Sequence, residues 1–436
     1  MSSARADVAI RRAGGSDATA VADVFLASFA ATYDFPLAHA DDDVRGWVRD
    51  VLLVERESWV ATEGDEIVAL LALAPGWVDQ LYVRPDRLGR GIGRRLMDHA
   101  KERSPDALRL YTFQVNDRAR RFYERNGFVA AWFGDGSANE EGQPDVRYAW
   151  EPAPDSIVRC PYGADIAVFE SGDQDRTPLV LVHGATADHT TWRTSGPVLG
   201  GRHRLFAVDR RGRGASGDGA PGEPYAIELE FRDLAAVVDA VAERTGRSVD
   251  VVGHSYGGRI ALGAALRTEA IRRLVVYEGA PAAPGVGYQD ADAATVQRIE
   301  ALVAAGDRDA ALAAFMREIV GMPDADLEAY RADPIWPRRA AAVQTTIREL
   351  RAETSPGASL ASLGDVGQPV LQILGGSCAP AFAAATRALH ARLRNGRVVA
   401  IDGARHAAHH THVAAFVAAI ETFLADPSLR RGSDSA

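Results

Sequence analysis

Two glycine-rich turns of different chemistry lie far apart in this chain of 436 residues, and they constrain its fold more than any other feature. The turns are Arg87-Leu88-Gly89-Arg90-Gly91-Ile92-Gly93 and Gly253-His254-Ser255-Tyr256-Gly257-Gly258. The first is typical of a loop whose backbone N–H groups bind a diphosphate at the start of a helix. The second is typical of a sharp strand-to-helix turn that exposes a serine hydroxyl. Because neither motif serves the other's chemistry, the sequence predicts two enzymes fused in one chain.

The composition is that of an ordinary soluble protein with a buried core, since 47% of the residues are apolar and 25% are charged. A formal net charge of -10 argues against a nucleic-acid partner, because binding phosphates requires a basic surface. The two cysteines, Cys160 and Cys378, lie far apart and lack metal-ligand spacing. We therefore expect no disulfide framework and no metal site.

The start of the chain and its apolar stretches predict where the protein resides. Residues 1–7 contain no apolar stretch of signal-peptide length, and no segment approaches the ~20 apolar residues of a membrane span. We expect a cytoplasmic protein that acts on small-molecule substrates and has no membrane partner. The sequence does not indicate its oligomeric state.

The first third of the chain alternates short strands with helices. We predict strands over 8–11, 58–61, 67–73, 78–83 and 107–113, and helices over 17–31, 91–103 and 117–126. A proline-containing segment over 151–156 then interrupts both patterns and predicts a linker.

Beyond the linker, strands alternate with helices in an order that predicts a largely parallel sheet. The predicted strands span 164–170, 179–182, 204–208, 249–252, 274–277, 370–374 and 398–401. Between 278 and 368 the strand signal gives way to alanine-rich helical stretches. We interpret this insertion as a helical cap over a site at the edge of the sheet.

Three motifs in the first third of the chain occur in a recognisable order. They are Leu81-Tyr82-Val83-Arg84-Pro85, then Arg87 to Gly93, then Asn116-Asp117-Arg118-Ala119-Arg120-Arg121-Phe122-Tyr123-Glu124-Arg125-Asn126-Gly127-Phe128. With these motifs, residues 8–150 resemble the GNAT superfamily of acetyl-CoA-dependent acyltransferases. The resemblance implies a splayed sheet whose fourth strand, 79–83, pairs with the pantetheine arm, and a following loop that holds the pyrophosphate of acetyl-CoA. The implied cofactor-binding residues are Leu81, Tyr82, Val83, Leu88, Gly89, Arg90, Gly91, Ile92, Gly93 and Asn116.

The chain departs from the family pattern at Leu88, where the family usually has Gln or Arg, so Arg87 or Arg90 must supply that charge. The acidic run 41–43 can attract a cationic amine, but acidic residues at the start of a helix are ordinary, and we favour that interpretation.

The resemblance also implies roles for three polar residues. Tyr123 matches a tyrosine near the coenzyme sulfur, where a phenol can protonate the leaving thiolate, although it is also suited to pack with Phe122 and Phe128. Asn116 matches an asparagine that contacts the pantetheine region, and it is equally suited to cap the following helix. Asp79 is the nearest acidic candidate for the general base, with a solvated strand carboxylate as the alternative.

Four segments of the remaining chain carry a second resemblance. They are His183-Gly184-Ala185, Asp209 to Ser216, the turn around Ser255, and Gly403-Ala404-Arg405-His406. In this order they make residues 156–424 similar to the α/β-hydrolase superfamily. The resemblance implies that Ser255 attacks an acyl carbon, that His406 acts as general base and then acid, and that the N–H groups of Ala185 and Tyr256 form the oxyanion hole.

The catalytic histidine and its acid have to be chosen among several residues. His406 follows a strand and a small turn, whereas His409, His410 and His412 fall toward the next helix, where we expect them on the surface. The family's usual aspartate position after the seventh strand holds Cys378. Some relatives carry the acid after the sixth strand, where this chain has Glu278, so we predict Glu278 as the triad acid.

Together these inferences predict an α/β protein of two domains, a GNAT-like domain over 1–152 and an α/β-hydrolase domain over 156–426. The helical cap spans about 283–365, and a flexible tail spans 427–436. The predicted function is a bifunctional N-acetyltransferase, with acetyl-CoA as acyl donor, and serine hydrolase acting on an ester, amide or thioester. The alternative is that one domain is a catalytically weak binding or regulatory module.

Overall fold

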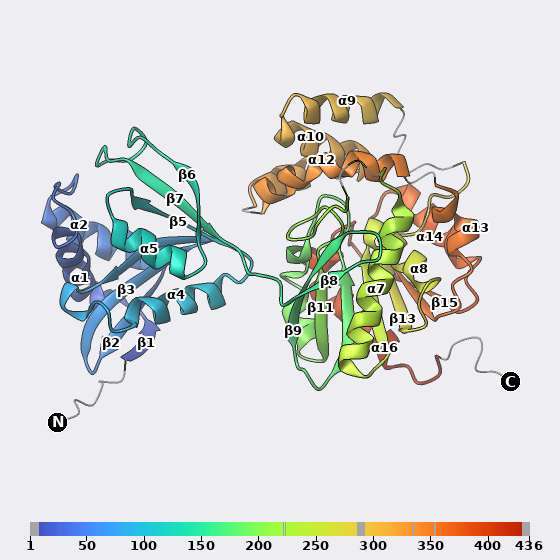
Figure 1. The fold of residues 1–436 in the computed structure, drawn as a ribbon, viewed down its shortest axis with the longest axis horizontal. Coiled ribbons are helices and arrows are strands. Elements are labelled where there is room, and N and C mark those ends of the chain that lie inside the picture. The colour runs from blue at the N-terminus through green and yellow to red at the C-terminus, as the bar shows by residue number, and fades with distance from the viewer. Residues whose placement is uncertain are drawn as a thin grey trace. The chain divides into compact units, whose positions relative to one another are not determined.

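The structure, a computed structural model, describes residues 8–220, 222, 224–285, 293–333, 335–352 and 355–429. The chain divides into two compact units, Met1–Pro152 and Ala153–Ala436 (Figure 1). Each unit contains a mixed α/β arrangement around its own sheet, which confirms the predicted two-domain α/β fold. The chain start and most of the predicted tail lie outside the described residues.

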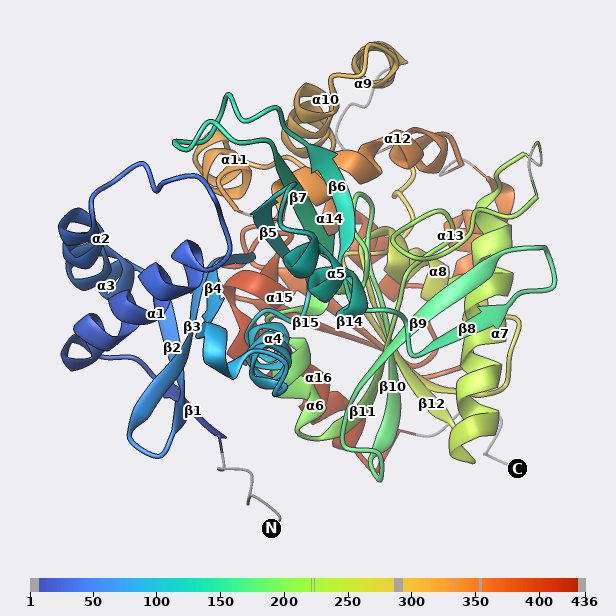
Figure 2. The same ribbon diagram turned by 60° about the vertical axis from the view of Figure 1, so that its left-hand side comes forward.

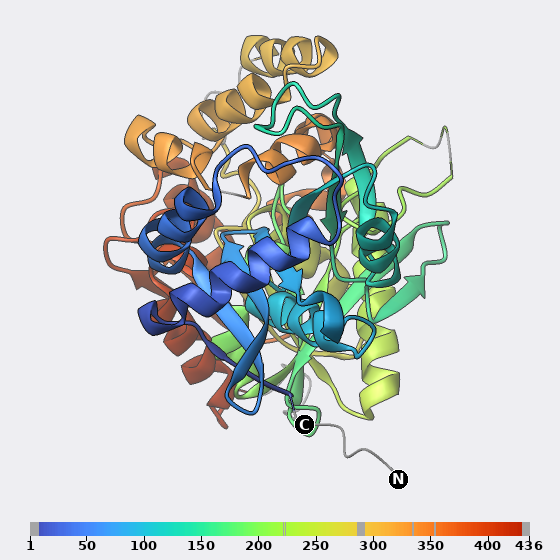
Figure 3. The same cartoon turned by 90° about the vertical axis from the view of Figure 1, so that its left-hand side faces the viewer.

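The first unit is a seven-stranded sheet with the order β1-β2-β3-β4-β5-β7-β6. Its strands are β1 (Val8–Arg12), β2 (Glu57–Glu63), β3 (Glu66–Ala74), β4 (Trp77–Val83), β5 (Leu108–Phe113), β6 (Val129–Phe133) and β7 (Asp145–Trp150). Its helices are α1 (Ala18–Ala30), α2 (Asp41–Trp47), α3 (Leu53–Glu55), α4 (Ile92–Arg103) and α5 (Asp117–Arg125). Figure 3 views this unit with α1 and α4 both in sight.

Helices α1 and α4 cover opposite faces of the sheet, because successive side chains of a strand point to opposite faces. Leu70 of β3 packs in one apolar cluster with α1, and the next residue, Leu71, packs in another with α4. Helix α4 contributes Ile92 and Leu96 to its cluster. This double coverage explains why β3 is apolar along almost its whole length.

Strands β4 and β5 diverge near the middle of this sheet. They form a single parallel bridge, at Trp77 and Arg109. A register shift between β3 and β4 passes over Asp79, since Ala72 pairs with Gln80 while Leu73 pairs with Val78. Bulges of this kind increase the local twist and bend the strand. The edge of β4 beyond the bridge therefore faces β5 without pairing to it.

The second unit is an eight-stranded sheet with the order β15-β14-β13-β12-β10-β11-β9-β8. Its strands are β8 (Ser156–Arg159), β9 (Asp165–Gly172), β10 (Thr177–Val182), β11 (His203–Val208), β12 (Val249–His254), β13 (Ile271–Tyr277), β14 (Val370–Gly375) and β15 (Gly396–Ile401). The six strands from β10 to β15 pair in parallel, and β8 and β9 are antiparallel additions. Since helices cover both faces, the central strands are buried along almost their whole length.

Two groups of helices cover this sheet (Figure 2). The helices α7 (Ile227–Thr245), α8 (Tyr256–Ala265) and α14 (Pro380–His390) share one apolar cluster. The other cluster contains α6 (Gly196–Gly200), the short α15 (Ala408–Thr411) and α16 (Val413–Ala425). The carboxyl ends of the parallel strands remain outside these layers, which is where ligands bind in sheets of this type.

A helical insertion separates β13 from β14. It comprises α9 (Ala293–Ala304), α10 (Arg308–Ala314), a π-helical turn at Phe315–Ile319, α11 (Asp324–Arg331) and α12 (Trp336–Ala352), which share an apolar cluster of their own. Figure 1 shows α9, α10 and α12 stacked beyond one end of the strands. The following helix α13 (Leu360–Leu363) packs against the main core instead, so the separate cap ends earlier than residue 365. Residues 286–292, 334 and 353–354 of the predicted cap lie outside the described residues.

Three strands were not predicted, namely β6, β7 and β8. Strand β8 begins at Ser156, the last residue of the predicted linker. A search of the described ranges for helices that could cross a membrane found none with the necessary length and apolar character.

Candidate functional site

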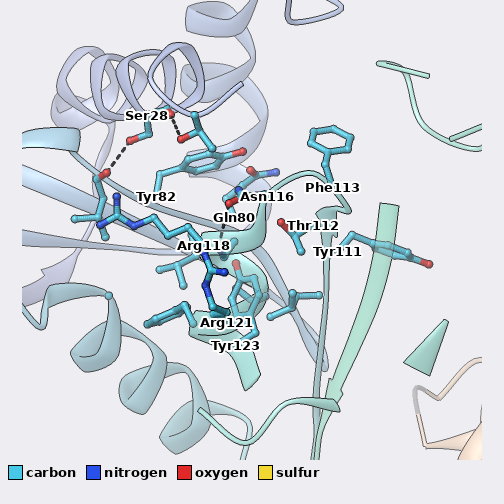
Figure 4. A pocket seen from close by; sticks show the side chains of 18 of the residues that line it. Ser28, Gln80, Tyr82, Tyr111, Thr112, Phe113, Asn116, Arg118, Arg121 and Tyr123 are labelled. Atoms are coloured by element: carbon cyan, nitrogen blue, oxygen red, sulfur yellow. Dashed lines mark hydrogen bonds between the residues drawn. The ribbon is translucent and has the colours of Figure 1, made fainter. Parts of the chain in front are cut away.

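A groove of about 1770 Å³ opens in the first unit where β4 and β5 diverge. One wall is the edge of β4 from Val78 to Val83, and the other combines β5 with α5 and the start of α4. Figure 4 shows Gln80 and Tyr82 of β4 gathered with Tyr123 and two arginines of α5 around this space. Of the residues predicted to bind acetyl-CoA, all but Arg90 line the groove.

The glycine-rich turn before α4 has the backbone geometry that its sequence predicts. Gly89 and Gly91 have φ values of 78° and 85°, in the left-handed region that favours glycine. Gly91 is the N-cap of α4, and the first N–H groups of a helix have no partner within it. This end of the groove therefore presents free backbone donors and the positive end of the helix dipole, which together suit a diphosphate.

Arg87 and Arg90 were expected to supply the charge that Leu88 lacks, and the two side chains lie in different surroundings. Arg87 pairs with Glu63 at 2.9 Å and with Glu66 at 3.0 Å, so carboxylates already occupy its guanidinium. Arg90 is 54% exposed, lies 3.8 Å from Glu63 and does not line the groove. The guanidinium of Arg90 thus lies nearer Glu63 than the groove, and its role in binding acetyl-CoA stays a prediction.

Sequence reasoning missed a row of basic residues on α5. Arg118, Arg121 and Arg125 all line the groove, and Figure 4 shows the first two beside Tyr123. Their spacing of three and four residues places them on one face of a helix. This spacing was visible in the sequence and is the signal that could have identified them.

The three polar residues with predicted roles lie in or beside the groove. Tyr123 is 8% exposed, and burial, followed by the nearby Tyr33, raises the pKa of its phenol well above the ordinary value. The Asn116 side chain caps α5 by accepting from Ala119 N–H at 3.0 Å, and it donates to the Tyr33 hydroxyl at 2.7 Å. The Asp79 carboxylate lies 3.4 Å from Arg56, so an ion pair competes with a role as base.

The end of the groove away from the glycine turn is aromatic and acidic. Tyr33 and Phe113 contact each other with ring centroids 5.2 Å apart, and Glu141 and Asp145 line the same region. The Asp41–Trp47 helix begins with the acidic run noted above, but that run does not line the groove. The groove is therefore basic at one end and acidic at the other.

In the second unit, Ser255 occupies the predicted sharp turn. Strand β12 ends at His254 and α8 begins at Tyr256, leaving Ser255 between them with φ 54° and ψ -125°. A Cβ at Gly257 would lie 2.3 Å from the backbone oxygen of His183, so only glycine fits there. In the described chain, the non-glycine residues with positive φ are Thr186, Ser255 and Glu278, and all three lie at this site or next to a residue that lines it.

Glu278 and His406 form the hydrogen bond on which a triad depends. Glu278 follows β13, and its Oε2 lies 2.5 Å from His406 Nδ1, while its Oε1 accepts from Gly375 N–H at 2.7 Å. Cys378 lies beside this carboxylate, and burial, followed by the charge of Glu278, raises the pKa of its thiol to about 11. The thiol is therefore protonated at neutral pH, which disfavours Cys378 as a nucleophile.

A cavity of about 40 Å³ brings the predicted hydrolase residues together. Ala185, Ser255, Tyr256, Glu278 and His406 all line it, together with apolar cap residues. No described backbone oxygen outside α8 accepts a hydrogen bond from the N–H of Ala185 or Tyr256. Both donors remain available at the cavity, as an oxyanion hole requires.

Two side chains fix the loop that carries His406. His254 Nε2 lies 2.9 Å from the backbone oxygen of His406, and the Tyr277 hydroxyl donates to the backbone oxygen of Arg405. His409 is also buried, ring to ring with His254, and burial lowers its pKa well below the ordinary value. The expectation that the neighbouring histidines lie on the surface is thus wrong for His409. Its position in the sequence did not reveal that α15 packs in the same apolar cluster as α16.

A buried cluster of charges connects the cap to the sheet. Arg210 forms two hydrogen bonds of 2.8 Å to Glu230 of α7, and Glu349 of the cap helix α12 accepts from Arg210 at 2.5 Å and from Arg213 at 2.7 Å. All four side chains are almost completely buried. Sequence reasoning missed Glu349, because its partners lie more than 130 residues away.

Among the described residues, one group has the arrangement that a metal ion requires, namely Asp188, His189 and Asp209. Asp188 pairs with Arg339 at 3.0 Å, and Asp209 accepts from the His189 backbone N–H at 2.7 Å. Both carboxylates therefore already bind groups of the protein itself.

Comparison with known proteins assigns a family to each unit. The family model of the alpha/beta hydrolase family matches residues 179–419, and that of the acetyltransferase (GNAT) domain matches residues 55–130. Two relatives of the first unit come from Escherichia coli. Peptidyl-lysine N-acetyltransferase YiaC is 31% identical over 27% of this chain and 82% of its own length, and YjaB, of the same description, is 30% identical over 31% and 91%.

A solved structure supports the fold of the second unit. The esterase RhEst1 from Rhodococcus sp. ECU1013 superposes with a TM-score of 0.51 at 22% identity, covering 63% of this chain and 98% of that protein. Both families consist of enzymes, and the matched ranges contain the motifs described in the sequence. The chain therefore belongs to the GNAT acetyltransferases through its first unit and to the alpha/beta hydrolase family through its second.

Proposed function

We propose that this chain is a bifunctional cytoplasmic enzyme that transfers an acetyl group from acetyl-CoA to a primary amine and hydrolyses an ester, amide or thioester of a small molecule. The contact between Glu278 and His406 at 2.5 Å, in a cavity that Ser255 also lines, is the observation that carries the hydrolase half. The groove between β4 and β5, which begins at the glycine turn, supports the acetyltransferase half.

In the proposed hydrolysis, Ser255 attacks the acyl carbon while His406 takes the proton of its hydroxyl. Glu278 accepts from His406 Nδ1, which leaves Nε2 as the base and stabilises the imidazolium that forms. The N–H groups of Ala185 and Tyr256 stabilise the oxyanion, and losing one such donor costs about 3 kcal/mol. His406 then donates its proton to the leaving group, and water releases the acyl group by the same steps.

In the proposed acetyl transfer, the turn before α4 and the arginines of α5 hold the phosphates of acetyl-CoA. The edge of β4 positions the thioester, and the amine attacks its carbonyl carbon from the acidic end of the groove. The C–S bond breaks as the new C–N bond forms, and Tyr123 donates a proton to the departing thiolate. The proton that the attacking nitrogen loses passes to solvent, from which the Tyr123 phenolate regains one. Burial keeps the phenol protonated at neutral pH, so a proton is available for this step. Asp79 stays a prediction as the base, given its ion pair with Arg56.

The acidic end of the groove supports a cationic acceptor. Glu141 and Asp145 lie there with Tyr33 and Phe113, and both carboxylates and aromatic faces attract an ammonium ion. The two Escherichia coli relatives are described as peptidyl-lysine N-acetyltransferases, so a lysine side chain is one acceptor of this class. A free amine of similar reach is the other.

Active-site labelling tests the hydrolase half. We expect a fluorophosphonate to modify Ser255 of the full chain rapidly and His406→Ala to abolish the labelling. Unlabelled Ser255 in the wild-type protein would instead support a binding or regulatory module. For the acetyltransferase half, release of free CoA in the presence of lysine-containing peptides or small amines is the expected result. Tight binding of acetyl-CoA without turnover over a broad panel of amines would indicate a sensor.

A further inference from the structure

One carboxylate oxygen of a residue that lines the hydrolase cavity is buried without a partner. Glu349 of the cap helix is 2% exposed, and its Oε1 accepts from both Arg210 and Arg213. Its Oε2 is also buried, and among the described residues no group donates a hydrogen bond to it. A buried acceptor left unsatisfied costs about 1–3 kcal/mol, so such an oxygen is unusual in a well-packed site.

This oxygen belongs to the part of α12 that faces Ser255. Thr346, Glu349 and Leu350 line the same cavity as Ser255 and His406, and their spacing of three and four residues places them on one face of the helix. The rest of the cap lining near them is apolar, including Phe315 and Ile319. Glu349 is therefore a polar group set among apolar ones, the pattern by which pockets orient a ligand.

Glu349 is ionised and held in one orientation. Burial alone raises the pKa of its carboxyl, but the charges of Arg210 and Arg213 outweigh burial and lower the pKa. Because both arginines donate to the same oxygen, they fix the rotation of the carboxylate and leave the other oxygen as an acceptor. The cluster of two arginines and two glutamates has no formal net charge, so the site does not require an ionic ligand.

The other glutamate of the cluster makes an informative contrast. Glu230 is equally buried, but both of its oxygens have partners. Arg210 donates to Oε1 and to Oε2, and Tyr225 also donates to Oε1, at 2.5 Å. Glu230 does not line the cavity. An acid needed only to neutralise the arginines has the environment of Glu230, whereas Glu349 has one additional free acceptor at the site.

We infer that Glu349 is a specificity-determining residue that accepts a hydrogen bond from an N–H or O–H group of the hydrolase substrate, close to the bond that Ser255 attacks. The inference rests on the proposed hydrolase function. A cavity of about 40 Å³ holds only a few atoms, which favours a compact donor such as a hydroxyl, amine or amide N–H. A substrate with a methyl group in place of the donor leaves Oε2 unsatisfied and is rejected.

Matched esters that differ in one group test the inference. On the acyl side, ethyl glycolate carries a hydroxyl where ethyl propanoate carries a methyl group, and on the alcohol side 2-hydroxyethyl acetate compares with propyl acetate. We expect the full-length enzyme to prefer the hydroxyl compound at least tenfold in kcat/KM in one of the two pairs. The responding pair shows on which side of the scissile bond the donor binds.

Glu349→Gln is the decisive variant. The two arginines hold the amide oxygen where Oε1 was, so the amide NH2 takes the place of Oε2 and turns an acceptor into a donor. The preference for the hydroxyl compound then falls, because its O–H has lost the charged acceptor. The control Glu230→Gln alters the same charge cluster away from the cavity and leaves the preference unchanged. If Glu349→Gln instead lowers kcat/KM equally for both compounds of each pair, so that their ratio is unaltered, Glu349 only holds the cap in place.

A binding measurement separates this inference from the proposed catalysis. In Ser255→Ala, calorimetry compares glycolamide with propanamide, and N-(2-hydroxyethyl)acetamide with N-propylacetamide. Tighter binding of one hydroxyl compound by at least tenfold, reduced by adding Glu349→Gln, supports the inference even when the wild-type enzyme hydrolyses no ester. Equal affinities within both pairs overturn it, whether or not Ser255 proves catalytic.

Discussion

The groove between β4 and β5 and the cavity at Ser255 differ in what builds them. The groove is formed largely by the open edge of a strand, by positive-φ glycines and by exposed arginines, and its volume is about 1770 Å³. The cavity, of about 40 Å³, is lined mostly by buried side chains, and non-glycine residues adopt positive φ at or beside it. The difference matches the proposed ligands. Acetyl-CoA is a long anion that needs backbone N–H groups along its length, whereas an acyl carbon under attack needs only a few fixed groups.

This contrast predicts that single side chains matter more in the cavity than in the groove. Replacing one buried, hydrogen-bonded group removes an interaction that nothing else supplies. In the groove, backbone N–H groups survive any side-chain change, and the arginines of α5 act in parallel. The predictions below probe this difference, beginning with the largest expected effect.

Glu278→Gln should reduce ester hydrolysis the most. The amide cannot hold His406 in the required tautomer, so we expect kcat/KM to fall by about 10⁴ while acetyl transfer is unchanged. Steady-state assays of both activities on the full chain measure this. Cys378→Ala, at the neighbouring side chain, is the matched control and should change kcat/KM less than tenfold. A comparable loss in the control would mean that position 378 contributes to the acid.

Tyr123→Phe should slow acetyl transfer without affecting hydrolysis. Loss of a general acid reduces the rate by about 10²–10⁴, and we expect the lower end because CoA thiolate is a good leaving group. Tyr148→Phe is the control, since Tyr148 is a buried neighbour whose hydroxyl donates to Glu124 at 2.7 Å. An unchanged kcat in Tyr123→Phe would assign this tyrosine to packing alone.

The stability of the second unit should depend on His410. Burial lowers the pKa of His410 from its ordinary value of 6.5 to about 3, so the unfolded chain takes up the proton first as the pH falls. Folding stability is therefore lost between pH 6.5 and 3, by about 2 kcal/mol at pH 5. His410→Gln should remove this part of the pH dependence. Hydrogen exchange of peptides from β12 and β13 at pH 7 and pH 5 measures it, and an identical pH dependence in the variant would contradict the prediction.

The smallest effect is expected in the groove. The double substitution Arg118→Ala and Arg121→Ala should raise KM for acetyl-CoA about tenfold and leave kcat unchanged, because exposed charges contribute little each. Arg45→Ala is the control, since this residue of α2 pairs with Asp23 and does not line the groove. A loss in kcat of more than tenfold would show that these arginines act on the reacting atoms.

Local patterns in the sequence were sufficient for much of this architecture. The β-branched runs of β12 and β13 and the glycines around Ser255 gave the nucleophile turn. The candidate acid Glu278, at the end of β13, came from the resemblance to α/β-hydrolases that carry the acid after this strand. Strand β6 was missed because it is short and mostly exposed, so its apolar residues follow no clear period.

Contacts between distant residues were not predictable in the same way. The ion pair of Arg90 depends on Glu63 of β2, and the free oxygen of Glu349 depends on arginines from the loop after β11. The buried state of His409 depends on how α15 packs. In each case the partner lies on another element, and a single sequence does not reveal which elements meet.

The claim that one chain holds two independent reaction centres is tested most directly by measuring both activities in Ser255→Ala and in Tyr123→Phe of the full chain. Our account predicts that Ser255→Ala abolishes ester hydrolysis and keeps wild-type acetyl transfer, and that Tyr123→Phe slows acetyl transfer by about 10² and keeps wild-type ester hydrolysis. Loss of both activities in either variant, with the fold intact by circular dichroism, would contradict it.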